Sequence, residues 1–138
     1  MANKILLEVV TPDRLLLSKE VEVVVATSVE GEFAVLYGHV PFLASLAVGE
    51  LKLKDGNNTD YAAISGGFAE VTGSKVTVLA EAAELAREID VDRARKARER
   101  AEQRLAKAAS EQINYTRAEA ALKRAILRMK VAERSKAA

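Results

Sequence analysis

The stretch Ile89-Asp90-Val91-Asp92-Arg93-Ala94 divides this chain into two parts of different character. Before it, short alternating apolar runs are broken by Gly, Asn and Asp, which is the pattern of β-strands and turns. After it the chain has neither Gly nor Pro, and the strongest helix formers dominate: Ala, Arg, Lys, Glu and Leu. The sequence therefore predicts a β domain over residues 1–88 and an α-helical domain over residues 89–138.

The net charge changes sign at the same place. Up to Ile89 the chain carries 7 basic and 13 acidic residues, whereas from Asp90 onward it carries 14 basic and 7 acidic residues. A basic helical part suits an anionic partner, which could be a nucleotide phosphate, an acidic protein surface or a nucleic acid. Tyr115 is the only aromatic residue there, which disfavours single-stranded nucleic acid because its bases stack on aromatic rings.

The composition excludes several kinds of site. A chain of 138 residues with 49% hydrophobic residues can bury one good core. The absence of Cys excludes disulfides and thiolate metal sites, and a single His excludes the usual zinc sites. No apolar run approaches the roughly 20 residues of a membrane span, and the N-terminus lacks the features of a signal peptide. We therefore expect a cytosolic protein without a metal.

The β domain is expected to consist of many short strands. The expected strands cover residues 4–10, 21–27, 33–36, 42–46, 50–54, 60–64, 67–71 and 75–80. Turn sequences separate them, such as Thr11-Pro12-Asp13, Asp55-Gly56-Asn57-Asn58 and Thr72-Gly73-Ser74. Short strands at a spacing of about 8 to 12 residues, without helices between them, are typical of an antiparallel β-sandwich or barrel. The fold class that the sequence predicts is α+β, an antiparallel β-sandwich followed by a two-helix hairpin.

Two helices are expected in the C-terminal domain, over residues 91–109 and 114–134, joined by the polar Ser110-Glu111-Gln112. Each has one narrow apolar stripe at helical spacing. The stripes are Val91, Ala94, Ala97, Ala101, Leu105 and Ala108 on the first helix, and Ala118, Ala121, Leu122, Ala125, Met129 and Ala132 on the second. The short link favours an antiparallel hairpin with the stripes in contact. Because a buried methyl group contributes only about 0.8 kcal/mol, we expect a weakly held hairpin that could act as a switch.

Basic residues also form rows along these helices. The rows are Arg93, Lys96, Arg100 and Arg104 on the first helix, and Arg117, Arg124 and Arg128 on the second. Glu99, Glu102, Glu119 and Glu133 could neutralise some of them through i,i+4 pairs, which would leave an ordinary solvated face. The excess of positive charge is too large for that explanation alone, so an anionic partner is expected.

Few residues suggest catalysis. Ser65-Gly66-Gly67 lacks the downstream Gly-Lys-Ser/Thr of a phosphate-binding loop and is not a nucleophile elbow. His39 either contacts a partner at a loop tip or is only a turn residue. Asp90 and Asp92 have two interpretations: they cap the helix and oppose its dipole, or one of them accepts a hydrogen bond from a ligand amine or hydroxyl.

The whole chain resembles the ε-subunit family of bacterial F-type ATP synthases. The resemblance rests on Glu30-Gly31-Glu32-Phe33, Gly38-His39-Val40-Pro41, Ser65-Gly66-Gly67-Phe68-Ala69-Glu70-Val71 and Val76-Thr77-Val78-Leu79-Ala80-Glu81, in that order. The stretch from Ile89 to Ala94 is similar to the family's nucleotide-binding signature, Ile/Leu-Asp-x-x-Arg-Ala. Ala34 and Tyr37 depart from the Gly and Pro that many relatives carry in the first loop.

This resemblance implies a part in a larger machine. The sandwich would pack on the γ subunit and touch the c-ring near Glu32 and His39, at the cytoplasmic face of the bacterial plasma membrane, with the membrane reached only through the complex. The hairpin would lie against the sandwich with ATP bound, or extend among the catalytic αβ subunits and block ATP hydrolysis. The subunit would have no catalytic residue of its own.

The resemblance also implies a nucleotide site. The family's ATP contacts fall on Glu84, Asp90, Arg93, Arg100, Arg124 and Arg128, the last two if one extra residue is allowed in the interhelical turn. Arg suits a triphosphate because its fork donates bidentate bonds, and a carboxylate could accept the adenine amino group. No metal and no nucleic acid is implied.

Two alternatives come from other functional classes. A free-standing basic hairpin could bind nucleic acid, with the sandwich as a carrier domain. An enzyme could use Asp90 and Glu84 as acid and base, but no recognisable nucleophile or metal site accompanies them.

Overall fold

The structure is a computed structural model that describes residues 3–107 and 114–136. The chain divides into two compact units, Met1–Leu85 and Ala86–Ala138, which we call the β unit and the helical unit. The sequence placed the division between residues 88 and 89, at the start of the first long helix. The unit boundary lies a few residues earlier because a short 3-10 helix, η1 (Ala86–Glu88), groups with the helices.

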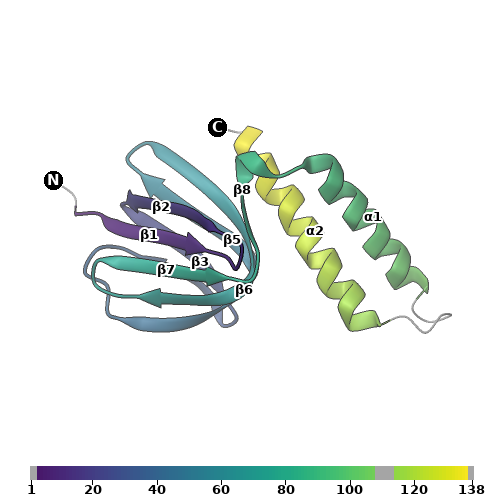
Figure 1. The fold of residues 1–138 in the computed structure, drawn as a ribbon, viewed down its shortest axis with the longest axis horizontal. Coiled ribbons are helices and arrows are strands. Elements are labelled where there is room, and N and C mark those ends of the chain that lie inside the picture. The colour runs from purple at the N-terminus through teal and green to yellow at the C-terminus, as the bar shows by residue number, and fades with distance from the viewer. Residues whose placement is uncertain (1–2, 108–113, 137–138) are drawn as a thin grey trace. The chain divides into compact units, whose positions relative to one another are not determined.

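The β unit is built from strands that form one continuous hydrogen-bonded sheet, curved into a sandwich (Figure 1). The strands are β1 (Ile5–Val10), β2 (Leu15–Val21), β3 (Val23–Ser28), β4 (Gly31–Val35), β5 (Phe42–Asp55), β6 (Asn58–Val71), β7 (Lys75–Ala80) and β8 (Ala83–Leu85). Their order is β2-β1-β7-β6-β5-β3-β4, and β8 pairs with β6. This confirms the predicted fold class, although β1 and β7 pair in parallel while the other pairs are antiparallel.

The core of the β unit comes from strict alternation along the strands. In β1, Ile5, Leu7 and Val9 are fully buried, and the residues between them are half-buried. Successive side chains of a strand point to opposite faces, so alternate apolar residues produce one inward face. Large aliphatic side chains from β5, Leu51 and Leu53, complete this core with 2% or less of their surface exposed.

Two predicted strand breaks are wrong. Residues 42–46 and 50–54 belong to one 14-residue strand, β5, and residues 60–64 and 67–71 belong to another, β6. Gly49 does not make a turn: a Cβ there would lie 2.5 Å from the Cβ of Thr27, so Gly permits β3 to approach β5 closely. Gly67 has a φ of 120°, and a Cβ on it would collide with the carbonyl oxygen of Leu79 on β7.

Three short elements were missed, and one strand was misplaced. The strand expected at 21–27 starts at Val23, because Val21 ends β2. The strand β2 itself was missed since Lys19 and Glu20 obscure its alternation, and β2 lies at the end of the sheet order. The three-residue elements β8 and η1 are too short to give a periodic signal.

The helical unit is an antiparallel hairpin of α1 (Val91–Lys107) and α2 (Tyr115–Lys136), which pack against each other (Figure 1). The hairpin prediction is thus confirmed, and the expected link Ser110-Glu111-Gln112 lies outside the described residues. Buried alanines of both helices follow the predicted stripes: Ala94, Ala101, Ala118, Ala125 and Ala132. Val91 is exposed instead, and Ala108 lies outside the described residues.

The prediction of one narrow stripe per helix is wrong for α2. Leu127 and Val131 are buried although they lie on the side of α2 opposite the alanine stripe. The 3-10 helix η1 packs against α2. A Val or Leu contributes about 1.5 to 3 kcal/mol when buried, so α2 is held by more than alanine methyl groups.

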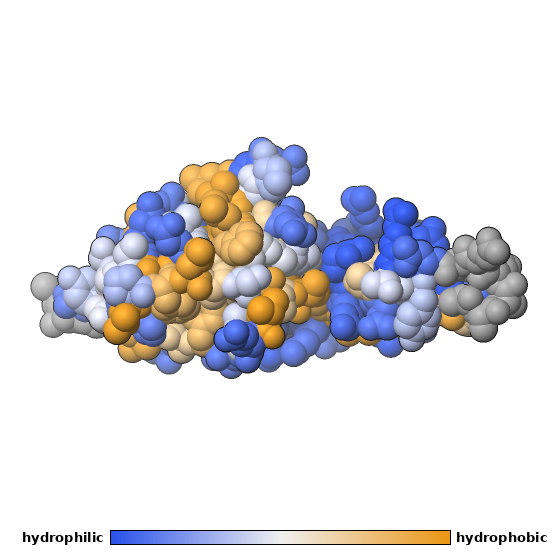
Figure 2. Space-filling view, turned by 90° about the horizontal axis from the view of Figure 1, so that it is seen from below, coloured by the Kyte–Doolittle hydropathy of each residue, from blue (hydrophilic) through white to orange (hydrophobic). Residues whose placement is uncertain are grey.

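Neither described helix is long and apolar enough to cross a membrane. Figure 2 shows apolar side chains gathered on the surface of the β unit, and a mainly hydrophilic surface on the helical unit.

Candidate functional site

The first turn of α1 begins with a capping aspartate. The Asp90 carboxylate oxygen Oδ1 accepts a hydrogen bond of 3.1 Å from the backbone N–H of Arg93. The Asp90 carbonyl oxygen accepts another of 3.0 Å from the N–H of Ala94. These two bonds are those of an N-cap residue, so the capping interpretation of Asp90 is confirmed. The exposed Asp92 pairs with Arg95 at 3.5 Å, which is the weaker kind of surface ion pair.

The arginine rows run beside the seam, which is the line along which the apolar stripes of α1 and α2 meet. Each arginine directly precedes a residue of an apolar stripe. The pairs are Arg93–Ala94, Arg100–Ala101 and Arg104–Leu105 on α1, and Arg117–Ala118, Arg124–Ala125 and Arg128–Met129 on α2. One residue turns an α-helix by about 100°, so each row lies just beside the seam.

Both rows lie on the same side of the hairpin. When an antiparallel pair of helices is viewed from one end, residue numbers increase clockwise around one helix and anticlockwise around the other. A residue one position before the seam therefore points to the same side on both helices. We call the six arginines the arginine face: Arg93, Arg100, Arg104, Arg117, Arg124 and Arg128.

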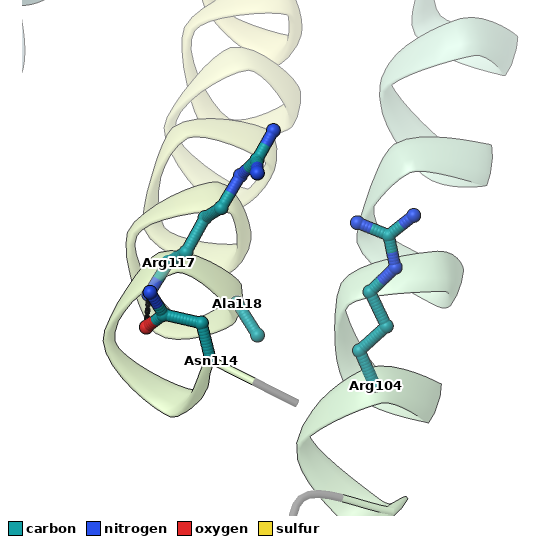
Figure 3. A pocket seen from close by; sticks show the side chains of 4 residues that line it. All are labelled: Arg104, Asn114, Arg117 and Ala118. Atoms are coloured by element: carbon teal, nitrogen blue, oxygen red, sulfur yellow. Dashed lines mark hydrogen bonds between the residues drawn. The ribbon is translucent and has the colours of Figure 1, made fainter. Parts of the chain in front are cut away.

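A pocket at one end of this face supports the placement. It has a volume of about 320 Å³ and is lined by Arg104 of α1 together with Asn114, Arg117 and Ala118 of α2. Figure 3 shows the two arginine side chains coming from the facing helices, with the methyl group of Ala118 between them. Asn114 caps α2 here, because its Oδ1 accepts a 3.1 Å bond from the N–H of Arg117.

Most guanidinium groups of the arginine face lack a counter-charge among the described residues. Some basic side chains outside the face do pair with carboxylates, as Arg98 does with Glu102 at 2.7 Å and Lys123 with Glu119 at 3.8 Å. Within residues 3–107 and 114–136, no ion pair or side-chain hydrogen bond involves five guanidinium groups of the face: those of Arg93, Arg100, Arg104, Arg117 and Arg124. Five cations on one face, without a carboxylate partner in the described part of the chain, are the kind of arrangement that suits an anion.

The glutamates that could neutralise some of the row arginines find other partners or none among the described residues, apart from any contact of Arg128. Glu102 and Glu119 do form i,i+4 pairs, but with Arg98 and Lys123, which are not in the rows. In the described part of the chain, neither Glu99 nor Glu133 has an ion pair. Among the described residues, these four glutamates therefore form no ion pair with Arg93, Arg100, Arg104, Arg117 or Arg124.

The predicted nucleotide-site residues fall in both units. The structure brings Arg93, Arg100, Arg124 and Arg128 to one face of the hairpin, with Asp90 at the start of α1. Glu84 belongs to the β unit, where it is half-buried on β8 opposite Ala63 of β6. Their binding of ATP remains a prediction.

The predicted c-ring contacts lie at and after β4. Glu32 is exposed on β4. The half-buried His39 has Nδ1 2.8 Å from the carbonyl oxygen of Val40, and since a carbonyl only accepts, Nδ1–H is the donor. Its ring lies 5.1 Å from that of Phe42, which in turn meets Phe33 edge-on at 5.2 Å. His39 is thus fixed by a small aromatic cluster, and its contact with a partner remains a prediction.

The sequence reading missed an apolar patch on the β unit. Leu43, Phe68 and Leu79 expose 68%, 53% and 53% of their surface. Phe68 of β6 lies directly opposite Leu79 of β7, and Leu43 comes from the neighbouring strand β5. Alternation would have revealed them, because their sequence neighbours Ala69 and Val78 are fully buried and so point inward. Contiguous exposed apolar side chains often mark protein contacts.

Among the residues that the structure describes, no group of three or more His, Cys, Asp or Glu side chains is arranged to hold a metal ion.

Comparison with known proteins gives one consistent family. Residues 4–86 match the family model "ATP synthase, Delta/Epsilon chain, beta-sandwich domain", and residues 87–133 match "ATP synthase, Delta/Epsilon chain, long alpha-helix domain". The chain is 55% identical over 131 residues to the ATP synthase epsilon chain of Nitratidesulfovibrio vulgaris strain DP4, covering 95% of this chain and 97% of that one.

Two further proteins extend the match. The epsilon chain of Syntrophobacter fumaroxidans is 55% identical over 135 residues, covering 98% of this chain and all of its own length (100%). Among solved structures, a chain of the Euglena gracilis mitochondrial ATP synthase, OSCP/F1/c-ring in rotational state 1, matches with a TM-score of 0.78 at 28% identity. That match covers 99% of this chain and 83% of the other.

Proposed function

The chain belongs to the ATP synthase delta/epsilon chain family, and from this premise we propose that it acts as the ε subunit in the central stalk of an F-type ATP synthase. The observation that supports this most directly is that both units match the family in order, over nearly the whole chain. The subunit is non-catalytic, and ATP is made or hydrolysed by the assembly. Its place is peripheral, at the cytoplasmic face of the bacterial plasma membrane.

The β unit provides the attachment. Its partners are the γ subunit and the c-ring, and its exposed apolar patch of Leu43, Phe68 and Leu79 supports a permanent protein contact. Glu32 and His39 remain the proposed c-ring contacts. The exposed position of Glu32 and the fixed ring of His39 are compatible with that role.

The helical unit provides regulation. The guanidinium groups that the arginine face brings to one side of the hairpin support binding of the ATP triphosphate, with Arg93, Arg100, Arg124 and Arg128 as phosphate donors and Asp90 and Glu84 as carboxylate acceptors. When the hairpin leaves its folded position, the same basic face would meet acidic segments of the catalytic αβ subunits and inhibit ATP hydrolysis. ATP favours the folded hairpin because it binds that state in preference to the extended one.

Co-purification tests the subunit assignment. A tagged copy expressed in its own cells should bring down the γ subunit and the catalytic subunits in fixed ratio. Recovery of nucleic acid instead, released by moderate salt, would favour the free-standing nucleic-acid binder. The comparisons give that alternative no support, because the family models cover both units.

A further inference from the structure

We propose that Arg104 and Arg117 form a further subsite for a phosphate-type dianion at the end of the arginine face. This goes beyond the proposed nucleotide site, whose residues do not include this pair. The pair lines the pocket of about 320 Å³ with Asn114 and Ala118 (Figure 3). The chemistry that fits is a tetrahedral anion with several acceptor oxygens, since each guanidinium fork donates two parallel bonds.

The pair lies next to the nucleotide residues and beyond them along the hairpin. On α1, Arg104 lies about 6 Å beyond Arg100 along the helix axis, and about 16 Å beyond Arg93. On α2, Arg117 lies about 10 Å from Arg124, in the direction away from Arg128. The two helices thus add one further pair of arginines beyond the four assigned to ATP, at the end nearest the N-terminus of α2.

The charges of the pair also require an explanation. Neither guanidinium group has a carboxylate partner among the described residues, although other basic residues of the same helices have one. Both arginines are exposed, so their long side chains can reach an anion between them without distorting the helices. Two like charges on facing helices repel each other, and an anion between them would relieve that repulsion. The hairpin should therefore be stabilised near its α2 N-terminal end when the anion is bound.

The pocket is lined by three polar side chains and one methyl group, that of Ala118, which is 4% exposed. The carboxamide oxygen of Asn114 is already used in the helix cap, so the amide nitrogen is the group that can donate to a ligand. Free orthophosphate and the terminal phosphate of a nucleotide share the required chemistry.

The test uses the full chain at low ionic strength, with inorganic phosphate as the probe and sodium chloride at equal ionic strength as the reference. The backbone and side-chain NMR signals of Arg104 and Arg117 should shift as phosphate is added, and the shifts should reach a plateau at high phosphate concentration. The double variant Arg104→Gln with Arg117→Gln should weaken phosphate binding at least tenfold. The matched control, Arg95→Gln with Arg98→Gln, removes the same charge from paired arginines outside the arginine face and should change the affinity less than twofold.

Three results would overturn the subsite: shifts that do not saturate, equal weakening in the control, or loss of phosphate binding in Arg124→Gln with Arg128→Gln while the Arg104 and Arg117 variant binds normally. Circular dichroism must show unchanged helicity in each variant.

A last experiment adds ATP to the protein with phosphate already bound. Displacement of orthophosphate by ATP would identify the nucleotide's terminal phosphate as the occupant, whereas simultaneous binding would identify free orthophosphate, and either result supports the subsite. Failure of ATP to bind with phosphate binding intact would affect only the proposed regulatory function.

Discussion

The two units of this protein bury side chains of different size. The β unit is centred on Ile5, Leu7, Leu51 and Leu53, whose exposed fractions are 2% or less. The seam between α1 and α2 is lined mostly by alanines. Because burial energy scales with apolar area, the first unit has a core of its own and the second gains much less from its seam. Side-chain size thus separates a unit with a large apolar core from a hairpin with a thinner apolar seam, which is the difference expected if the proposed ATP control acts on the hairpin.

The strongest test of this comparison removes the helical unit. A chain ending at Glu88 should remain folded, because its large buried side chains all come from strands of the β unit. Dispersed amide signals in an NMR spectrum would show this. In the assembled complex, the same deletion should leave ATP synthesis largely intact and raise ATP hydrolysis at low ATP concentration.

Two outcomes would contradict this view. Collapsed amide dispersion in the shortened chain would mean that the β unit depends on the helices. Unchanged hydrolysis over a range of ATP concentrations, without a proton gradient, would remove the regulatory role and leave a coupling subunit only.

A second prediction compares buried and exposed leucines in the β unit. Leu51→Ala should lower the free energy of unfolding by about 2 to 5 kcal/mol, because it removes buried methyl groups and leaves a cavity. Leu43→Ala is the matched control, since Leu43 exposes 68% of its surface. Urea unfolding of the full chain, followed by a signal from the β unit, measures both. A similar loss in the two variants would show that the core is not centred on β5.

A third prediction concerns the unpaired charges of the helical unit. Arg124→Gln should weaken ATP binding to the isolated protein about tenfold or more, because it removes charge-assisted hydrogen bonds to phosphate. Arg98→Gln removes the same charge but lies outside the arginine face, where Arg98 pairs with Glu102. Calorimetry should find that Arg98→Gln binds ATP with nearly the wild-type affinity. Equal losses would mean that ATP responds to net charge and not to a defined site.

The sequence predicted those features that depend on local patterns. Alternation in residues 4–10 gave β1 to within one residue, and the helical spacing of alanines gave the hairpin. The local patterns did not reveal contacts between residues far apart in the sequence. Gly49 was assigned to a break because the approach of Thr27 from β3 cannot be seen in local sequence. The burial of Leu127 and Val131 likewise depends on tertiary contacts of α2.

The candidate site was predictable only in part. The spacing of the arginines was evident, but two rows on separate helices share a face only if the helices are antiparallel and meet along the alanine stripes. Which carboxylates pair with which bases was also undetermined, and Glu102 and Glu119 proved to pair outside the rows. The meeting of Arg104 and Arg117 at one pocket depends on the register between the helices, which no local pattern specifies.

The smallest expected effect, at Asp90, tests whether the junction between the two units is structural, functional or both. Asp90→Ala should cost the helical unit about 1 kcal/mol, because the bond to the N–H of Arg93 is lost. Asp90→Asn keeps an oxygen at the same position. Because Asn is about as good a cap, this variant should keep the stability of the helical unit to within a few tenths of a kcal/mol and should keep wild-type helicity. The two variants therefore separate capping from charge. If the carboxylate also accepts a hydrogen bond from the adenine amino group, Asp90→Asn should weaken ATP binding while the helicity measured by circular dichroism stays constant. Wild-type ATP affinity in Asp90→Asn would restrict Asp90 to its capping role, and equal helicity in Asp90→Ala and Asp90→Asn would show that the cap contributes nothing measurable to the stability of α1.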